Sequence, residues 1–381
     1  MIFTKKWGFM KTVGIISEYN PFHKGHLRQI EAIRRQFDEE VCIVALMSGN
    51  YVERGELAIY PKYYRAETAI RAGIDLVLEL PYPWSGSCAE TFALGGVSLA
   101  TSLGLDYLCF GSETGDLSAL VTEKERLQSD VFKDALDRAV KADAKTPYAI
   151  LRERVYRDLY QESCSKRPND ILATTYLMAI DCLKSPIKPL VIKREGGESA
   201  TASREAIRCE NLDELKNLVP QCSYETATKL KPVKTEALER AFLKDWILME
   251  KEDTEGVFEL TEDLYYRIRT AAENTYSYKE LLGNVASASY TNARIRRVLL
   301  STIFGVTREM LFEKPAFTVL LGLGKWGRTF LKRVEFPILM RMSGVEDYGE
   351  EVARQAKIAD RADRIYRLAD ENPWRHKPFV E

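Results

Sequence analysis

Residues 15–26 read Ile15-Ile16-Ser17-Glu18-Tyr19-Asn20-Pro21-Phe22-His23-Lys24-Gly25-His26, and this is the most informative segment of the chain. A β-rich run ends at Ser17, Asn20-Pro21 breaks it, and a helical segment opens at His23-x-Gly25-His26. The whole chain has three histidines, and two of them lie here. Side chains three residues apart share one face of a helix, so the pattern predicts two imidazoles side by side on the first helical turn.

The start of a helix is a favourable place for phosphate. Its unpaired backbone N–H groups and the positive end of its dipole attract anions, and Gly25 would let a phosphate chain approach closely. His23 and His26 would stabilise charge developing on an α-phosphate and a leaving pyrophosphate, which is electrostatic catalysis. The alternatives are a capping and a packing histidine, or a metal site. Two histidines without a nearby cysteine or paired carboxylates make a poor zinc site, so we predict phosphate chemistry and no bound metal.

Outward from this motif, β-rich runs alternate with amphipathic helices from residue 11 to about residue 210. One predicted helix covers 27–37, and the predicted strands are 12–17, 41–47, 76–80, 107–110 and 189–193. This alternation predicts a Rossmann-like α/β domain with a parallel sheet and helices on both faces. Ligands of such sheets bind beyond the carboxyl ends of the strands.

The remaining chain has a different character. Residues 211–381 are rich in Leu, Glu, Lys and Arg, show no convincing β-run, and predict a mainly helical C-terminal domain. Residues 291–304 are one clear amphipathic helix. Residues 1–10 precede the organised sequence, and we expect them to form an N-terminal extension.

Composition excludes several classes of protein. The 381 residues suffice for two domains, and 45% hydrophobic with 29% charged residues is ordinary for a globular protein. A formal net charge of -1 excludes a function based on overall positive charge, but not a local basic surface. The seven cysteines are scattered without a CxxC pair, which argues against zinc knuckles and disulfide frameworks. No apolar stretch reaches the roughly 20 residues that span a bilayer, so we expect a cytoplasmic protein without membrane contact.

Further candidate ligand residues follow other predicted strands or open helices. Gly111 would permit close approach of a ligand, Asn169 would cap a helix or bind a nucleotide, and Arg194 would stack on adenine or pair with a phosphate. Ser203 would cap a helix, with Arg208 one turn along, which suits the β- and γ-phosphates of a nucleotide. The alternatives are a strand-ending turn, a plain helix cap and surface arginines. The polar, glycine-containing loop 47–56 is a candidate active-site loop, with a solvated connection as its alternative.

Taken together, these motifs resemble the bacterial tRNA(Met) cytidine acetate ligase family of the HxGH nucleotidyltransferase superfamily. The resemblance runs from Met10 over nearly the whole chain. It rests on Glu18-Tyr19-Asn20-Pro21-Phe22-His23-Lys24-Gly25-His26, Met47-Ser48-Gly49-Asn50 with Arg54-Gly55-Glu56, Ala72-Gly73-Ile74-Asp75-Leu76-Val77 with Glu79-Leu80-Pro81, Phe110-Gly111-Ser112-Glu113, Pro168-Asn169 and Ile192-Lys193-Arg194. The extended first string is far more specific than a bare HxGH.

The resemblance implies an ATP-dependent ligase. Such an enzyme converts acetate to acetyl-adenylate, releases pyrophosphate, and passes the acetyl group to N4 of the wobble cytidine of elongator methionine tRNA. Its partners would be ATP, acetate and tRNA(Met), with Mg²⁺ accompanying ATP. Carried over by position, the catalytic residues would be His23 and His26. The ATP-binding residues would be Ile16, Ser17, Glu18, Tyr19, Asn20, Pro21, Phe22, His23, Lys24, Gly25, His26, Gly111, Asn169, Arg194, Glu195, Ser203 and Arg208.

The second phosphate motif of the superfamily departs from its expected form. We expect Ser-Ala-Thr-x-Ile-Arg, and residues 203–208 read Ser203-Arg204-Glu205-Ala206-Ile207-Arg208. Glu205 in place of threonine would put a negative charge close to the phosphates.

Basic residues outnumber acidic ones between residues 267 and 341. With the resemblance, this favours tRNA binding through the backbone phosphates, helped by stacking on Trp326. The alternative is a solvated helix surface. The candidate tRNA-binding residues are Arg294, Arg296, Arg297, Lys325, Arg328, Lys332 and Arg333.

Two other functions compete with this interpretation. One is an adenylyltransferase acting on a small cofactor precursor, although a small acceptor does not require a second domain with a basic face. The other is an RNA-binding protein whose nucleotide site is degenerate; the intact His23-x-Gly25-His26 argues against it, and Glu205 argues for it.

Overall fold

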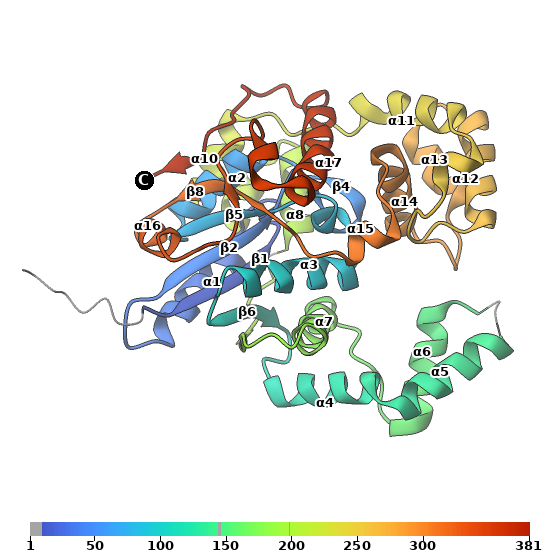
Figure 1. Cartoon of the computed structure of the whole chain (residues 1–381), viewed down its shortest axis with the longest axis horizontal. Coiled ribbons are helices and arrows are strands. Elements are labelled where there is room, and N and C mark those ends of the chain that lie inside the picture. Colours follow the sequence, from blue (N-terminus) through green and yellow to red (C-terminus); the bar gives the residue numbers. More distant parts are fainter. Residues whose placement is uncertain (1–9, 144–145, 198) are drawn as a thin grey trace, which may run out of the picture.

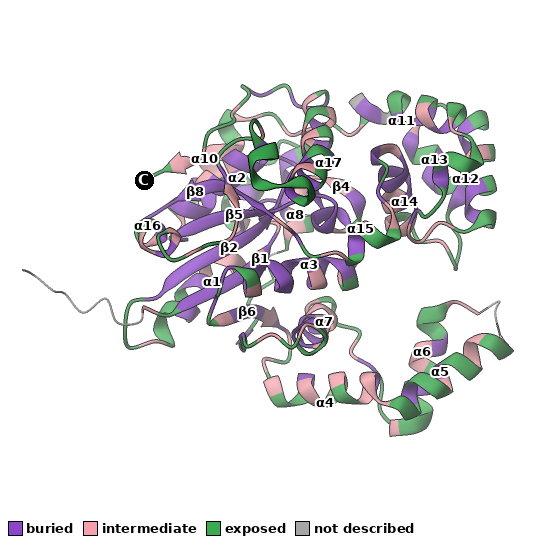
Figure 2. Cartoon of the chain, viewed as in Figure 1, coloured by how far each residue is buried: buried purple, intermediate pink, exposed green. Residues whose placement is uncertain are grey.

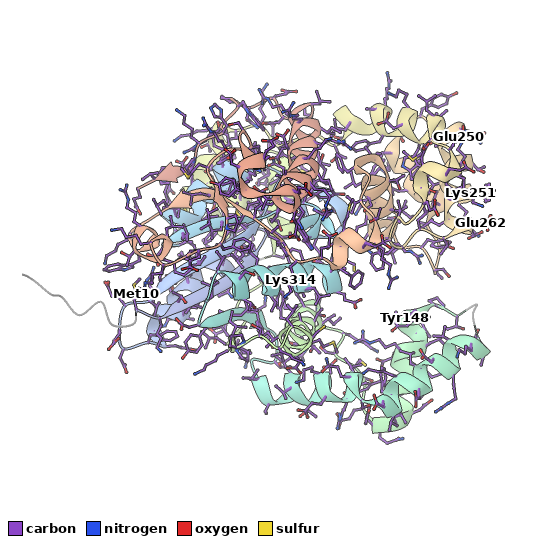
Figure 3. The ribbon with its side chains drawn as sticks, viewed as in Figure 1. Met10, Tyr148, Glu250, Lys251, Glu262 and Lys314 are labelled. Atoms are coloured by element: carbon purple, nitrogen blue, oxygen red, sulfur yellow. The ribbon has the colours of Figure 1, made fainter. Side chains whose placement is uncertain are left out.

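The computed structural model describes residues 10–143, 146–197 and 199–381, without the side chains of residues 237 and 239. Met10, where the described chain begins, lies close to the first strand (Figure 3). Apart from Met10, the expected N-terminal extension lies outside the described residues.

An eight-stranded sheet forms the centre of the molecule (Figure 1). Its order is β10-β8-β5-β2-β1-β6-β7, with β9 beside β8. Strands β1, β2, β5, β6 and β7 are parallel, whereas β8 runs antiparallel to β5. The bounds are β1 (Thr12–Ser17), β2 (Cys42–Ser48), β5 (Leu76–Leu80), β6 (Tyr107–Ser112), β7 (Lys188–Lys193), β8 (Thr318–Leu323), β9 (Ile338–Leu339) and β10 (Phe379–Val380).

Helices cover both faces of this sheet, which confirms the predicted α/β architecture. The central strands are apolar runs buried on both faces, as parallel strands between helical layers must be. One face packs against α1 (Lys24–Arg35), α2 (Lys62–Arg71) and α17 (Glu350–Arg367). The other packs against α3 (Ala89–Ser102), α7 (Pro168–Cys182) and α16 (Gly327–Leu331).

Three helices between β6 and α7 form an arm that extends away from the sheet (Figure 1). They are α4 (Leu117–Gln128), α5 (Asp130–Ala142) and α6 (Tyr148–Tyr160). A small core that includes Phe132, Leu136 and Leu151 holds α5 and α6 together. Most of the arm's surface is exposed or half-buried, in contrast to the buried sheet (Figure 2).

The chain after β7 is mainly helical, as predicted. It contains α8 (Ala200–Arg208), α9 (Leu212–Leu218) and α10 (Gln221–Lys229), and then a lobe of α11 (Glu236–Leu248), α12 (Glu262–Asn274), α13 (Tyr278–Val285), α14 (Asn292–Phe304) and α15 (Arg308–Phe312). Trp246, Ile268 and Val298 are fully buried in the lobe's core. Glu250, Lys251 and Glu262 lie at its outer end (Figure 3).

Three strands of the main sheet, β8, β9 and β10, lie where the sequence predicted none. Strand β8, residues Thr318–Leu323, pairs with β5 inside the main sheet, and all six of its residues are buried. Gly322 allows this close packing, since a Cβ there would lie 2.8 Å from Ile70 Cγ1. The C-terminal part therefore contributes to the sheet as well as to the helical lobe.

A short hairpin joins the sheet to the lobe. It consists of β3 (Tyr51–Val52), the turn Glu53–Gly55 and β4 (Glu56–Leu57). Gly55 has a φ of 68°, and a Cβ there would lie 2.8 Å from the backbone nitrogen of Arg297 on α14. The positive φ and the close approach of the α14 backbone both require glycine at position 55. The hairpin therefore packs directly against α14.

Candidate nucleotide-binding site

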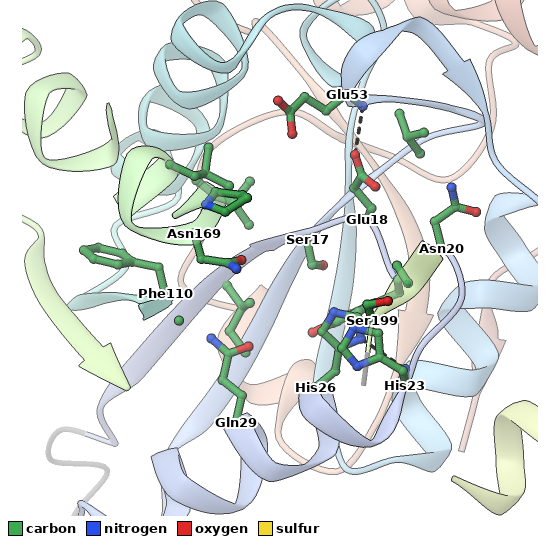
Figure 4. A pocket seen from close by; sticks show the side chains of 18 of the residues that line it. Ser17, Glu18, Asn20, His23, His26, Gln29, Glu53, Phe110, Asn169 and Ser199 are labelled. Carbon is green, nitrogen blue, oxygen red and sulfur yellow. Dashed lines mark hydrogen bonds between the residues drawn. The ribbon is translucent and has the colours of Figure 1, made fainter. Parts of the chain in front are cut away.

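A cavity of about 450 Å³ opens beyond the carboxyl ends of β1 and β6, where an α/β sheet binds ligands (Figure 4). Of the residues predicted from the sequence, the following line it: Ile16, Ser17, Glu18, Tyr19, Asn20, His23, His26, Gly111, Asn169 and Arg194. A second cavity of about 260 Å³ adjoins it; this cavity shares His26, Gly111 and Arg194 with the first and is also lined by Gly25 and Glu195 of the predicted set. Pro21, Phe22, Lys24, Ser203 and Arg208 line neither cavity.

The turn between β1 and α1 is shaped by two polar residues. Tyr19 has a φ of 46°, a left-handed conformation that is uncommon for a residue with a side chain. Asn20 Oδ1 accepts a hydrogen bond from the backbone N–H of Ile59 at 2.7 Å. This turn brings the start of α1 to the floor of the cavity.

The two motif histidines lie against each other at the start of α1. His23 is the residue that caps the helix, and its ring stacks on that of His26 with the centroids 3.7 Å apart. The backbone N–H of His23 donates to His26 Nδ1 at 3.1 Å, which leaves Nε2 of His26 as the protonated, donating nitrogen. Burial, then the charges of His23 and Arg194, hold the pKa of His26 well below its usual value. A neutral His26 therefore offers a hydrogen-bond donor to the cavity.

Gly25 is required for a reason that the sequence did not reveal. A Cβ at this position would lie 2.8 Å from His23 Cε1 and 2.9 Å from His23 Nδ1. Glycine thus makes room for the His23 ring.

The second phosphate motif lies four residues earlier than the sequence analysis placed it. Ser203 is fully buried, with its hydroxyl donating to the Ser199 carbonyl at 3.1 Å, and Arg208 is at the far end of α8. Instead, Ser199, Thr201 and Arg204 line the cavity. Residues 199–204 read Ser199-Ala200-Thr201-Ala202-Ser203-Arg204, which fits the expected Ser-Ala-Thr-x-Ile-Arg with serine in place of isoleucine. Glu205 is therefore not part of this motif.

The placement of Arg204 follows from the start of α8. Ser199 caps this helix by accepting the N–H of Ala202 at 3.1 Å, so the helix begins at the cavity. Arg204 reaches back from it to donate to the Asn20 carbonyl at 2.9 Å. Two helix starts, of α1 and α8, therefore face the same cavity.

A polar network fixes the opposite wall. Asn169 Oδ1 accepts from Arg194 Nη1 at 3.2 Å, and its Nδ2 donates to Glu113 Oε1 at 2.6 Å. Gly111 leaves space for the Arg194 side chain, since a Cβ there would lie 3.0 Å from Arg194 Cγ. The three predicted residues Gly111, Asn169 and Arg194 thus form one continuous surface.

Several residues that line the cavity were not predicted from the sequence as site residues. Glu53 and Arg54 come from the turn after β3, Gln29 from α1, and Phe92 and Tyr176 from α3 and α7. The loop containing Glu53 and Arg54 was predicted as an active-site loop, and Arg54 belongs to a string that carries the family resemblance, but neither residue was assigned a role. The others lie within helices where their spacing indicates only packing.

Glu18 and Glu53 stand together at one end of the cavity. The backbone N–H of Glu53 donates to Glu18 Oε1 at 2.9 Å (Figure 4). Burial, reinforced by the charge of Glu53, raises the pKa of Glu18 to about 7. Among the described residues no group of three or more His, Cys, Asp or Glu side chains could hold a metal ion.

The first group of predicted tRNA-binding residues, the three arginines of α14, binds acidic side chains and a carbonyl of the same chain. Arg297 forms a two-pronged ion pair with Glu259 at 2.6 and 2.7 Å. Arg294 donates to the Glu259 carbonyl at 2.6 and 3.0 Å, and Arg296 pairs with Glu56 at 2.8 Å. In this arrangement the three arginines hold α14 to the hairpin and to its own lobe.

The second group of predicted tRNA-binding residues lies at the amino ends of the parallel strands, away from the cavity. Lys325, Arg328, Lys332 and Arg333 follow the carboxyl end of β8, which is antiparallel to β5. The N–H of Gly324 donates to the Asp75 carbonyl at 2.8 Å, at the amino end of β5. The cavity lies at the carboxyl ends of the parallel strands. Helices α16 and α14 lie on opposite sides of the molecule (Figure 1). The two predicted groups therefore do not form one basic surface.

Comparison with known proteins agrees with the motifs. The model of the HIGH nucleotidyl transferase family matches residues 10–378. A tRNA(Met) cytidine acetate ligase of Caldanaerobacter subterraneus subsp. tengcongensis is 33% identical, over 95% of this chain and 96% of that protein. One of Lysinibacillus sphaericus is 31% identical, over 89% and 91%.

The chain belongs to the HIGH nucleotidyl transferase family, among the tRNA(Met) cytidine acetate ligases. Thermotoga maritima TmcAL bound with alpha-thio ATP superposes with a TM-score of 0.87 and 28% identity, over 95% of both chains. The apo form of the same protein gives 0.88 and 27%, over 97% of this chain and 99% of that one. The resemblance derived from the motifs is confirmed. No helix in the described ranges has the length and apolar character needed to cross a membrane.

Proposed function

We propose that this protein activates acetate with ATP and transfers the acetyl group to N4 of the wobble cytidine of elongator tRNA(Met). The observation that carries the proposal is the cavity at the starts of α1 and α8, which holds both histidines of the HxGH motif. It is supported by end-to-end similarity to proteins named tRNA(Met) cytidine acetate ligase, and to a neighbour bound to an ATP analogue.

In the first step, an acetate oxygen attacks the α-phosphorus of ATP. The bond between the α-phosphorus and the bridging oxygen breaks, and that oxygen leaves with pyrophosphate. His26, the N–H groups at the starts of α1 and α8, Arg194 and Arg204 would stabilise the charge that develops on the phosphates. Mg²⁺ would arrive on the triphosphate, held by phosphate oxygens and water, as is usual for this ion.

Gly111, Asn169 and Arg194 would bind the nucleoside and its phosphates. Arg194→Ala is expected to weaken ATP binding about tenfold or more, because a hydrogen bond to a charged group contributes about 1.5–3 kcal/mol. Arg208→Ala is the matched control, since Arg208 lines neither cavity. Titration calorimetry of both variants with ATP measures the difference. Equal affinities would show that Arg194 does not contact the nucleotide.

For the RNA backbone we propose the basic rim beside the cavity. Arg28, Arg35, Lys193 and Arg194 line the second cavity, which shares His26, Gln29, Gly111 and Arg194 with the first. This rim is on the side of the sheet where the chemistry takes place, unlike Lys325 and its neighbours. An RNA backbone bound along this rim would allow one nucleotide, turned out of the RNA, to reach the phosphate end of ATP where the reaction takes place. Because the substrate is a tRNA, we place the protein in the cytoplasm.

Two alternatives are weaker. An adenylyltransferase for a small cofactor precursor does not account for similarity to RNA-modifying ligases over 95% of the chain. A degenerate nucleotide site does not account for an intact pair of stacked histidines and a complete Ser-Ala-Thr-x-x-Arg segment at the same cavity.

The test is transfer of radiolabelled acetate to purified tRNA(Met), with ATP and without acetyl-CoA. We expect label on N4 of the wobble cytidine and release of AMP and pyrophosphate. Label that requires acetyl-CoA, or pyrophosphate release only with other small acceptors, would contradict the ligase assignment.

A further inference from the structure

The cavity has an acidic end that the phosphates of ATP do not explain. Glu18 and Glu53 lie there, across the cavity from Gln29 (Figure 4). Glu18 Oε1 is fixed by the Glu53 N–H at 2.9 Å, and within the described part of the chain no hydrogen-bond partner holds its Oε2. Two carboxylates would repel phosphates, so this end is built for a different part of the reaction.

The buried hydroxyl of Ser17 also lies beside these carboxylates. Ser17 is 9% exposed, lines the cavity, and lies between Glu18 and His26 (Figure 4). Its Oγ makes no hydrogen bond of ordinary geometry among the described residues and approaches only the Tyr19 hydroxyl, so a ligand would complete its hydrogen bonding.

The walls near the carboxylates are apolar and aromatic. Val52 directly precedes Glu53, and Phe92 and Tyr176 line the same cavity. Burial raises the pKa of Tyr176 well above its usual value, and the charges of Glu53 and Glu18 add to this increase. Apolar walls with carboxylates at one end suit a flat heteroaromatic ring that carries an amino group. Adenine, guanine and cytosine all carry such a group. Because the nucleoside of ATP is assigned to the wall of Gly111, Asn169 and Arg194, the base at the acidic end is the acceptor cytosine, whose N4 donates to Glu or Asp side chains.

We propose that Glu18 and Glu53 form the site for the acceptor cytosine, and that Glu18 takes the proton from its N4 amino group during acetyl transfer. The inference rests on the proposed function and deepens it. N4 attacks the carbonyl carbon of acetyl-adenylate, and a new N–C bond forms. The bond between that carbon and the phosphate oxygen breaks, and its electron pair leaves with AMP. One N4 proton passes to Glu18 Oε2, so the amide product is neutral.

The environment of Glu18 suits this role. With a pKa of about 7, raised mainly by burial, Glu18 can both accept and release a proton near neutral pH. The pKa of His26 lies well below its usual value, so His26 stays neutral in this range. The charged and titratable groups that face Glu18 are Glu53, Arg54, Arg65, Tyr176, Arg204 and the histidine pair.

The test separates the two half-reactions in Glu18→Gln. Glutamine keeps the oxygen that accepts the Glu53 N–H, so the loop is preserved. Acetate-dependent exchange of labelled pyrophosphate into ATP should fall far less than acetyl transfer does, because the proton transfer assigned to Glu18 belongs to the second step. The single-turnover rate of acetyl transfer to tRNA(Met) should fall by about 10²–10⁴-fold, the usual contribution of a general base. The wild-type transfer rate should rise with pH through about 7, and this dependence should disappear in Glu18→Gln but remain in Glu53→Gln.

Each outcome is decisive. Equal losses in exchange and transfer, an unchanged transfer rate in Glu18→Gln, or a wild-type rate that is flat from about pH 5.5 to 8.5 would overturn the inference. The pH profile needs only the wild type, so it holds even if the variant folds poorly. Failure of the proposed function is distinguishable, because the wild type itself would then show no acetate-dependent exchange or no transfer to tRNA.

Discussion

Replacing both His23 and His26 by alanine is expected to lower the rate of acetyl-adenylate formation by at least about 10³-fold. Loss of one preorganised donor to developing charge typically costs about 10²–10³ in rate, and this variant loses both imidazoles at the start of α1. His26 Nε2–H is such a donor, because its Nδ1 is held by the His23 N–H and its pKa is low. Acetate-dependent exchange of labelled pyrophosphate into ATP measures the step directly.

The third histidine provides a matched control. His376 is exposed near the C-terminus and lines neither cavity. We expect His376→Ala to exchange pyrophosphate at the wild-type rate. ATP affinity of the double variant should fall less than its rate, since the histidines act on charge that develops during the reaction. Exchange within about tenfold of wild type in the double variant would show that other groups stabilise the phosphates.

The parallel half of the sheet could be predicted because its signals are local. Each strand from β1 to β7 in the main sheet is an apolar run, and the helices between them have a regular apolar spacing. Strand β8 could not be predicted in the same way. Its apolar run, Thr318–Leu323, is visible, but its partner β5 lies more than 230 residues earlier in the chain, and Leu78 pairs with Leu320 only in the folded protein.

The site was predictable where the motif itself sets the geometry. His23 and His26 follow from a strand, a turn and a helix in sequence. The second motif was placed in the wrong helical register, since Ser203 and Arg208 resemble the pattern but face the core and the far end of α8. Whether Ser199 or Ser203 caps the helix is decided by where α8 begins, which the sequence does not fix to within one turn.

The predicted RNA-binding arginines illustrate a further limit. Counting charges over residues 267–341 gives an excess of cations, yet Arg296 pairs with Glu56, 240 residues away in the sequence. Arg297 pairs with Glu259, outside the counted stretch. Sequence reveals charge but not the long-range acceptors that neutralise it.

A buried ion cluster links the C-terminal helix to the site, and its loss should have the largest effect on stability. Lys62 Nζ contacts Glu79 at 2.7 and 2.8 Å and Asp363 at 2.5 Å, joining α2, β5 and α17. Asn50 donates to Asp363 at 2.9 Å, so the loop that leads to Glu53 is tied to the same cluster. The side chains of Lys62 and Glu79 are 3% and 2% exposed. Burial opposes the charge of Lys62, but its two carboxylates outweigh this and raise its pKa.

Lys62→Met is expected to lower the free energy of unfolding by about 3–5 kcal/mol, because it leaves the buried carboxylate of Glu79 and the half-buried carboxylate of Asp363 without their cation. The effect should appear as a lower urea midpoint in tryptophan fluorescence. Lys325→Met is the matched control: its partner Glu40 is 59% exposed, so its midpoint should match the wild type.

The deficit of Lys62→Met should shrink as the pH falls. Burial raises the pKa of Glu79 to about 7 even with Lys62 present, and removing the cation that lowers it raises the pKa further. A carboxyl whose pKa is higher in the folded than in the unfolded protein binds its proton more tightly when folded. Stability is therefore gained as the pH drops from above 7 towards the ordinary glutamate value of 4.5. A deficit that is constant from pH 8 to about 5.5 would mean that the two carboxylates are already neutral, and that the lysine acts through packing alone.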